Sequence, residues 1–120
     1  MEELEITETD KGIKIITQAI PHCRSVSIMI GIGVGSRHEP DTYAGISHFL
    51  EHMLFKGTER KPNHRLITQP VENTGGSLNA STGYDSTIYW CRLPREFLRD
   101  TQSLGKRFGR ICYQIQSLSR

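Results

Sequence analysis

Two histidines and a glutamate stand within five residues of each other, in the run His48-Phe49-Leu50-Glu51-His52. In a helix, positions four apart share one face, so both imidazoles can reach the same metal ion. Glu51 falls on the same side, where its carboxylate can hold and deprotonate a water on that metal. The order H-x-x-E-H inverts the H-E-x-x-H motif of zinc hydrolases. The motif therefore predicts a Zn²⁺ site with His48 and His52 as ligands and Glu51 as general base. The alternative is an ordinary solvated helix face.

The residues around the motif predict the helix that this chemistry needs. Asp41 and Thr42 follow Pro40 and supply N-cap side chains, and Gly57 is a natural stop. At about 100° per residue, one apolar arc predicts the face turned to the core. That arc consists of Ile46, Phe49, Leu50, Met53 and Leu54.

The rest of the chain predicts a small α+β domain. The expected strands are Leu4–Thr9, Gly12–Thr17, Ser25–Val34, Ser77–Thr82 and Ser86–Leu93, and a second helix is expected over Asn63–Asn73 with Asn63 as its cap. Pro94 is expected to begin a third helix, and Pro70 to kink or break the second. This order predicts two layers, with helices packed on one face of a mainly antiparallel sheet. Gly31, Gly33 and Gly35 suggest close packing against another segment.

Several segments together resemble the N-terminal domain of the insulinase-type, or pitrilysin-type (M16), zinc metallopeptidases, in particular bacterial members that are similar to processing peptidases. The matching segments are Gly33 to Arg37, Gly45 to Thr58, Gly75 to Thr82 and Thr87 to Trp90. The resemblance covers residues 1–98, and it implies a zinc-dependent endopeptidase. It also implies that Asn79 and Ala80 lie on a strand edge that binds extended peptide substrate. The alternative for Asn79 is an ordinary edge or turn residue, with Gly75-Gly76 as a helix C-cap.

The same resemblance implies that this chain carries only part of a working site. Catalytic zinc normally takes three protein ligands, and the family's third is a glutamate far downstream of the second histidine. Glu72 and Glu96 do not match that glutamate. We therefore expect a truncated chain that binds zinc weakly, is marginally stable, and has little or no peptidase activity. It would need the remaining family domain or a homologous chain. Residues 99–120 form an atypical basic tail, and its composition is typical of a foreign or frame-shifted end.

Composition is compatible with this interpretation and leaves two alternatives. The net charge is +2, with 36% hydrophobic and 23% charged residues, which is typical of a globular domain. We expect no membrane span, because the longest apolar stretch, Ile28 to Val34, is too short and too rich in glycine. We expect no nucleic-acid partner, because no recognised nucleic-acid motif accompanies the basic residues. We expect a cytoplasmic location, because the N-terminus lacks the pattern of a signal or transit peptide. Cys23, Cys91 and Cys112 are expected to be free thiols. A non-catalytic scaffold and a basic surface-binding module are the remaining hypotheses. An intact Glu51 argues against the first, and only the basic C-terminal half supports the second.

Overall fold

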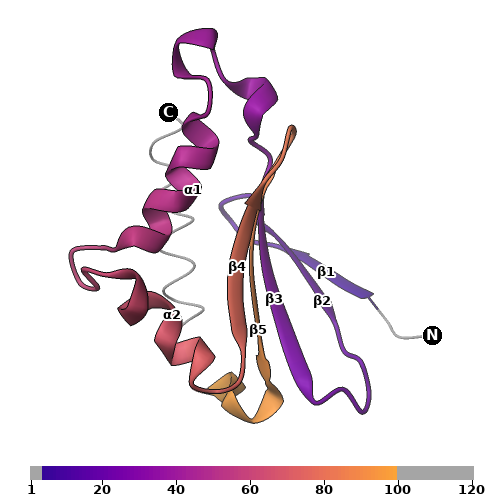
Figure 1. Ribbon diagram of the computed structural model, residues 1–120. Coiled ribbons are helices and arrows are strands. Elements are labelled where there is room, and N and C mark those ends of the chain that lie inside the picture. Colours follow the sequence, from indigo (N-terminus) through magenta and orange to yellow (C-terminus); the bar gives the residue numbers. More distant parts are fainter. Residues whose placement is uncertain (1–3, 100–120) are drawn as a thin grey trace.

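Three antiparallel strands form the main sheet, in the order β3-β5-β4 (Figure 1). The computed structural model describes residues 4–99 of the chain. Its central strand β5 (Thr87–Pro94) pairs with β3 (Ser25–Ile32) on one side and with β4 (Ser77–Thr82) on the other. Side chains alternate between the two faces of each strand, so every second residue of β5 is buried. The predicted positions of these strands are confirmed to within two residues.

Two helices lie against the same face of this sheet, beside β4 (Figure 1). They are α1 (Ile46–Lys56) and α2 (His64–Glu72). Within the described residues, the buried hydrophobic side chains are few: Val71, Tyr89, Cys91 and Leu93. Leu78 and Phe97 pack against the cluster that Val71, Cys91 and Leu93 form. The predicted α+β class, with helices on one face of an antiparallel sheet, is confirmed.

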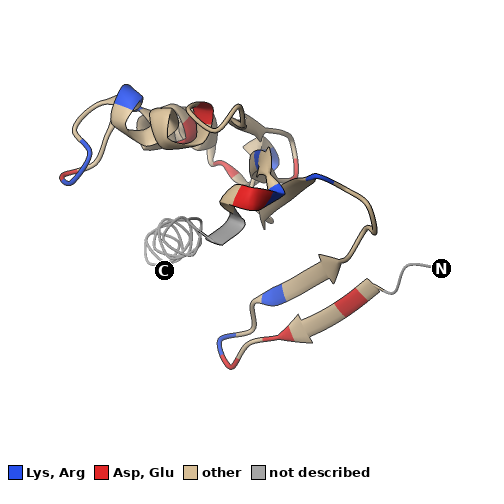
Figure 2. Cartoon of the chain, turned by 90° about the horizontal axis from the view of Figure 1, so that it is seen from below, with Lys and Arg blue, Asp and Glu red and all other residues tan. Residues whose placement is uncertain are grey.

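A separate two-stranded sheet precedes the main one. Strands β1 (Leu4–Glu8) and β2 (Lys14–Gln18) pair as the predicted hairpin, with Gly12 at a φ of +75° in its turn. Every residue of both strands is exposed, and Figure 2 shows the hairpin standing apart from the sheet that the helices cover. The hairpin therefore makes no part of the helix-facing core.

The start of α1 differs from the sequence-based expectation. Asp41–Tyr43 forms a short 3₁₀ turn of its own, and the helix begins at Ile46 with Gly45 as its N-cap. Gly45 has a φ of +89°, a conformation that favours glycine. The prediction of Asp41 and Thr42 as N-cap residues is wrong, because the first N–H groups of the helix bind a different side chain, which is described below.

The apolar arc of α1 is only partly used. Leu50 and Leu54 are partly buried toward the sheet, as predicted. Ile46, Phe49 and Met53 remain exposed, with 60% of Phe49 accessible to solvent. Positions 46, 49 and 53 form a stripe beside the contact with the sheet, and no described segment covers it. The predicted core face is therefore too wide.

Helix α2 confirms its predicted cap and contradicts its predicted break. The Asn63 side chain accepts a hydrogen bond from the Leu66 N–H at 3.0 Å. Pro70 lies inside the helix, which continues to Glu72. Proline has no N–H to give to the carbonyl four residues earlier, and that carbonyl, of Leu66, accepts instead from Lys61 Nζ at 2.7 Å. The lysine thus supplies the donor that the proline lacks.

The end of α2, and the glycines in and just after β3, test two further expectations. Gly75 has a φ of +77°, and the Gly76 N–H binds the Val71 carbonyl at 3.2 Å, so this pair does cap the helix. A side chain at Gly35 would meet the 83–86 turn, as predicted for close packing, whereas Gly31 and Gly33 face open space. The close-packing prediction is right for Gly35 only.

The end of the described segment also differs from expectation. Pro94 is the last residue of β5, and Arg95–Arg99 follows as a short 3₁₀ turn. The prediction that Pro94 begins a helix is wrong. The predicted basic tail lies almost entirely outside the described residues. None of the helices described is long and apolar enough to cross a membrane.

Candidate active site

The two motif histidines converge on one point. His48 and His52 are exposed on α1, and their Nε2 atoms lie 2.9 Å apart, with ring centroids separated by 4.5 Å. The two atoms are within hydrogen-bonding distance, and the tautomers of the two rings decide which of them donates. Helical spacing alone predicted that the two histidines share a face. The structure adds that the Nε2 atom of His48 faces the Nε2 atom of His52.

This arrangement fits two ligands of a zinc ion. Zinc binds imidazole nitrogen at about 2.0–2.1 Å in tetrahedral geometry, so two such nitrogens lie about 3.3 Å apart. The rings would need to separate by only about 0.4 Å to reach that spacing. Within residues 4–99, no group of three or more His, Cys, Asp or Glu side chains gathers where a metal could bind. The described residues therefore offer a candidate pair of ligands and not a complete coordination shell.

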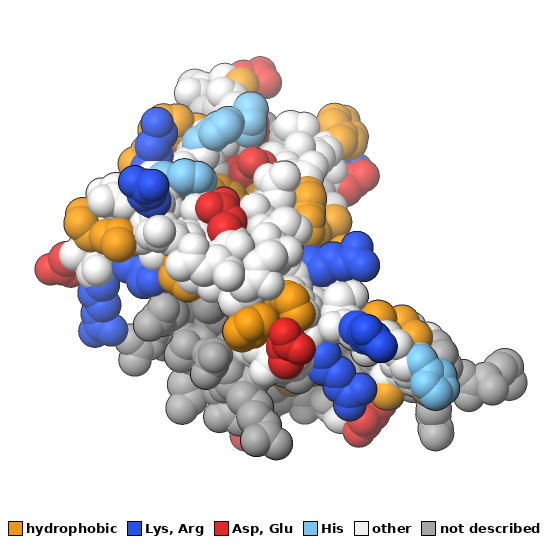
Figure 3. Space-filling model, turned by 60° about the horizontal axis from the view of Figure 1, so that its bottom comes forward, with side chains coloured by type: hydrophobic (Ala, Val, Ile, Leu, Met, Phe, Trp, Pro, Cys, Tyr) orange, Lys and Arg blue, Asp and Glu red, His pale blue; other side chains and the backbone are white. Residues whose placement is uncertain are grey.

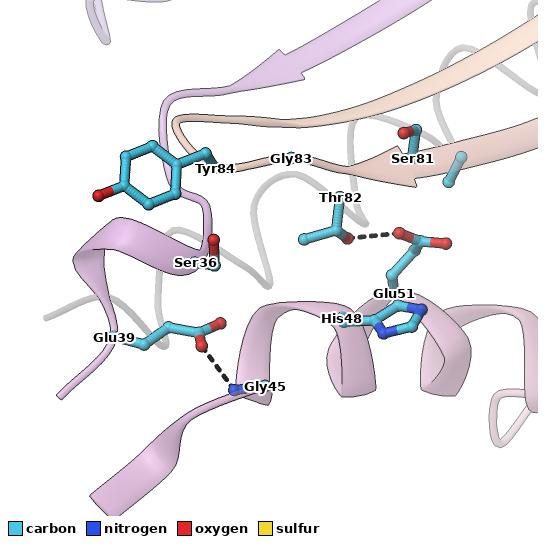
Figure 4. A pocket seen from close by; sticks show the side chains of 10 residues that line it. Ser36, Glu39, Gly45, His48, Glu51, Ser81, Thr82, Gly83 and Tyr84 are labelled. Atoms are coloured by element: carbon cyan, nitrogen blue, oxygen red, sulfur yellow. Dashed lines mark hydrogen bonds between the residues drawn. The ribbon is translucent and has the colours of Figure 1, made fainter. Parts of the chain in front are cut away.

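The Glu51 side chain points toward the end of β4 (Figure 4). Its Oε2 accepts a short hydrogen bond from the Thr82 hydroxyl, across 31 residues of sequence (Figure 4). Both residues are partly buried. This contact joins the predicted general base to the strand predicted to bind substrate. Thr82 did not stand out in the sequence as a site residue.

Glu39 holds the helix on which the motif lies. Its two carboxylate oxygens accept from the Gly45 N–H at 2.6 Å and the Ser47 N–H at 2.8 Å. Hydrogen bonding from the Ser47 side chain and then from these backbone groups lowers the pKa of Glu39 below its usual range. A carboxylate is also favoured at the positive end of a helix. Glu39 therefore supplies the side-chain acceptor at the start of α1, where Gly45 is the N-cap residue, and sequence reasoning missed it.

A pocket of about 620 Å³ lies between the first part of α1 and the end of β4. Glu39, His48 and Glu51 line one side of it, and residues 80–84 line the other, as Figure 4 shows. In Figure 3, histidine side chains lie close to acidic ones on the surface of the molecule. The pocket therefore brings the predicted ligand and base together with the predicted peptide-binding strand.

A backbone clamp fixes the far wall of this pocket. The Ser36 and Arg37 N–H groups donate to the carbonyls of Gly83 and Tyr84, at 3.1 and 2.9 Å. Arg37 also forms an ion pair with Asp85 at 2.5 Å. These bonds tie the segment that leads into α1 to the turn between β4 and β5. Only the close approach of Gly35 was foreseen from the sequence.

Asn79 and Ala80 lie on β4, which is an edge strand within residues 4–99, since β5 is its one partner there. The side-chain oxygen of Asn79 accepts from the Ala80 N–H at 2.8 Å. In an antiparallel pair, alternate residues direct their backbone groups away from the partner strand. The Gly83 N–H donates to the Ser86 carbonyl at 2.8 Å. This alternation makes residues 83, 81 and 79 direct their backbone groups toward β5. The backbone N–H and C=O of Ala80 therefore point away from β5. The outward donor at Ala80 is thus occupied by its neighbour's side chain.

Comparison with known proteins identifies the class to which this fold and motif belong. The family model for the insulinase peptidases, peptidase family M16, matches residues 14–101. The chain therefore belongs to this peptidase family.

Particular relatives are similar over the same region. The chain is 41% identical over 88 residues to the beta subunit of a mitochondrial-processing peptidase from Lentinula edodes, which is 73% of this chain and 19% of that protein. It is 45% identical over 82 residues to a zinc protease of Bacillus subtilis, which is 68% of this chain and 20% of the relative. The crystal structure of a protease from Helicobacter pylori superposes with a TM-score of 0.74 at 27% identity, covering 83% of this chain and 24% of that one. The chain thus spans about a fifth of the length of these curated relatives.

Proposed function

We propose that this chain carries the metal-binding and general-base half of a zinc endopeptidase site. The observation that carries the proposal is the approach of the His48 and His52 Nε2 atoms to 2.9 Å, with His48 and Glu51 lining the same pocket. Membership of a peptidase family, and relatives named zinc proteases, support the choice of metal and reaction. Cytoplasmic location remains an expectation.

His48 and His52 would hold Zn²⁺ through Nε2 as neutral imidazoles. Bound zinc supplies a Lewis acid that lowers the pKa of water and polarises a carbonyl. Glu51 would accept a proton from the attacking water and later give it to the leaving amine. His48 and Glu51 line the same pocket, so a peptide bond placed there would lie within reach of both.

The edge of β4 is the proposed peptide-binding surface, with Asn79 and Ala80 as its contact residues. An extended peptide adds to a sheet edge through backbone hydrogen bonds and needs no particular sequence. The pocket extends along residues 80–84 of this edge. A bound peptide would displace the Asn79 side chain from the Ala80 N–H and take its place. We propose peptides as the substrate class on this basis.

A third zinc ligand would come from the remaining family domain or from a homologous chain. One relative is named as a subunit of a processing peptidase, which supports a need for further protein. The isolated chain is accordingly proposed to bind zinc weakly and to cleave peptides slowly or not at all, since loss of positioning removes many orders of magnitude in rate.

Zinc binding is tested by isothermal titration of the wild-type chain, His48→Ala and His22→Asn. His22 is an exposed histidine with a φ of 66°, which asparagine tolerates. We expect His48→Ala to lose binding and His22→Asn to retain it. Equal binding by the wild type and His48→Ala would refute the assignment of His48.

Catalysis is tested with a quenched fluorescent peptide and added zinc, on the wild type and Glu51→Gln. We expect little turnover by the chain alone and a gain when a chain containing the missing family region is added. That gain should vanish with Glu51→Gln. Turnover that persists in Glu51→Gln would show that Glu51 is not the base.

A further inference from the structure

The contact between Thr82 and Glu51 is the polar interaction that joins the main sheet to the motif side of α1. Thr82 is the last residue of β4, and Glu51 lies in the middle of α1. An ionised carboxylate accepts hydrogen bonds and does not donate them. The threonine hydroxyl must therefore be the donor, and Oε2 of Glu51 the acceptor.

The alternation of β4 explains why Thr82 can reach the helix. Leu78, Ala80 and Thr82 are partly buried, while the residues between them are exposed. Successive side chains point to opposite faces of a strand, so Thr82 faces the helices. Leu78 and Ala80 are apolar, which makes Thr82 the hydrogen-bonding side chain on this face of β4.

Thr87, the cross-strand partner of Thr82, has a different role. Thr87 lies directly opposite Thr82 in the β4–β5 pair and is buried. Its hydroxyl donates to the Val34 carbonyl at 2.9 Å, outside the pocket lining. Two threonines on the same face of the sheet thus bind different acceptors, and only one of those acceptors belongs to the motif.

We propose that Thr82 is a positioning residue for Glu51. The hydroxyl holds Oε2 and so restricts a side chain with three rotatable bonds, which leaves Oε1 available to take a proton. Residues that orient reacting groups in this way are typical of metal enzymes. The inference rests on the proposed function of Glu51. It adds that the end of the peptide-binding strand and the general base are held together by one hydrogen bond.

The test measures the order of the Glu51 side chain by ¹³C NMR relaxation in the full chain. Four proteins are compared: wild type, Thr82→Val, Thr82→Ser and Thr87→Val. Valine keeps the branched shape of threonine and removes the hydroxyl. We expect the order parameter of the Glu51 side chain to fall in Thr82→Val, to be restored in Thr82→Ser, and to stay unchanged in Thr87→Val. Because Thr87 is the more buried of the two, Thr87→Val controls for a general loss of stability.

Zinc titration of the same proteins separates this inference from the function on which it rests. We expect the affinity at His48 and His52 to agree among the four to within about twofold, since neither threonine touches the imidazoles. Zinc that fails to bind the wild type would refute the proposed metal site, while the order of Glu51 would still report on Thr82. A Glu51 side chain that is equally mobile in wild type and Thr82→Val, or equally affected by Thr87→Val, would overturn the inference.

In the cleavage assay with the complementing chain, Thr82→Val should lower kcat by about tenfold and leave KM unchanged. Thr82→Ser should recover most of the loss. A change in KM alone would place Thr82 in peptide binding and would contradict a role through Glu51.

Discussion

At the scale of single residues, the motif depends on two side chains outside it. Glu39 fixes the first turn of α1 and Thr82 contacts Glu51 from the neighbouring strand. Helical spacing predicted the shared face of His48 and His52. It could not reveal Thr82, whose partner is 31 residues away. Alternation along β4 indicates which face Thr82 occupies but not which residue it meets there.

Replacing Glu39 should loosen the start of α1. We expect Glu39→Ala to lower the melting temperature and to speed amide exchange at Gly45 and Ser47, because these N–H groups lose their acceptor. Glu59→Ala, which removes an exposed carboxylate from a loop, is the control. Unchanged exchange at both amides would show that Glu39 does not supply this acceptor.

The same carboxylate makes this stabilisation depend on pH. The pKa of Glu39 is lower in the folded chain than in the unfolded chain. The stabilisation that Glu39 contributes is therefore complete above the pKa that this carboxyl has in the unfolded chain. The contribution is lost as the pH falls through the folded value. The difference in melting temperature between wild type and Glu39→Ala should therefore shrink on acidification below about pH 4, near the usual pKa of a glutamate. A difference that grows on acidification would contradict this sign.

At the scale of the elements, the sequence predicted the order and approximate bounds of the strands and of both helices. Alternation is strong in β3, and turn residues bound β4 and β5, so these predictions are confirmed. The start of α1 and the residue after β5 were wrong for physical reasons. A carboxylate from the preceding loop caps α1 in place of Asp41 and Thr42, and Pro94 completes a strand before the chain turns. The bonds from Glu39 span six and eight residues, which is further than the spacing that an N-cap pattern covers.

Gly35 is where the segment before α1 touches the β4–β5 turn most closely. A Cβ built there lies 2.5 Å from the Gly83 carbonyl oxygen and 2.6 Å from that of Tyr84. We expect Gly35→Ala to destabilise the fold by about 1–3 kcal/mol, because backbone atoms must move. Denaturant unfolding measures the loss. Gly33→Ala, which meets nothing within 4 Å, is the matched control and should change stability little. Equal losses in the two variants would contradict the close approach.

Pro70 and Lys61 form a compensating pair in α2. Lys61→Met should cost about 0.5–1.5 kcal/mol, because the Leu66 carbonyl loses its donor. In a Pro70→Ala background the helix regains a backbone N–H for that carbonyl, and the cost of Lys61→Met should fall. A double-mutant cycle by chemical denaturation measures this coupling. Strict additivity would show that the two residues act independently.

At the scale of the whole molecule, the buried core is small and much apolar surface is exposed. The chain spans about a fifth of the length of its relatives, and the stripe of Ile46, Phe49 and Met53 lies open on α1. Figure 3 shows hydrophobic side chains at several places on one surface of the molecule. Exposed apolar surface of this kind favours association. We therefore expect marginal stability in the isolated chain.

Cys91 offers a direct measure of that stability. It is 1% exposed, and burial raises the pKa of its thiol, so a thiol reagent should reach it only when the sheet opens. In a Cys112→Ser background, we expect Cys23 to be labelled rapidly and Cys91 slowly. The Cys91 rate should rise steeply with low denaturant. Slow labelling that persists up to a sharp unfolding transition of a monomer would indicate a stable fold and contradict our expectation.

The hydrogen bond between the Asn79 side chain and the Ala80 N–H affects how two copies of this chain can associate. An open sheet edge invites growth by a second strand, which leads toward aggregation. Here the donor at Ala80 is already taken by a carboxamide, so a neighbouring copy gains one backbone bond fewer from pairing there. The Asn79 side chain is exposed, and this hydrogen bond holds its oxygen at the Ala80 N–H. A peptide that brings a carbonyl to the same N–H could therefore replace it. Under the proposed function, a single side chain would thus protect this edge until a peptide displaces it.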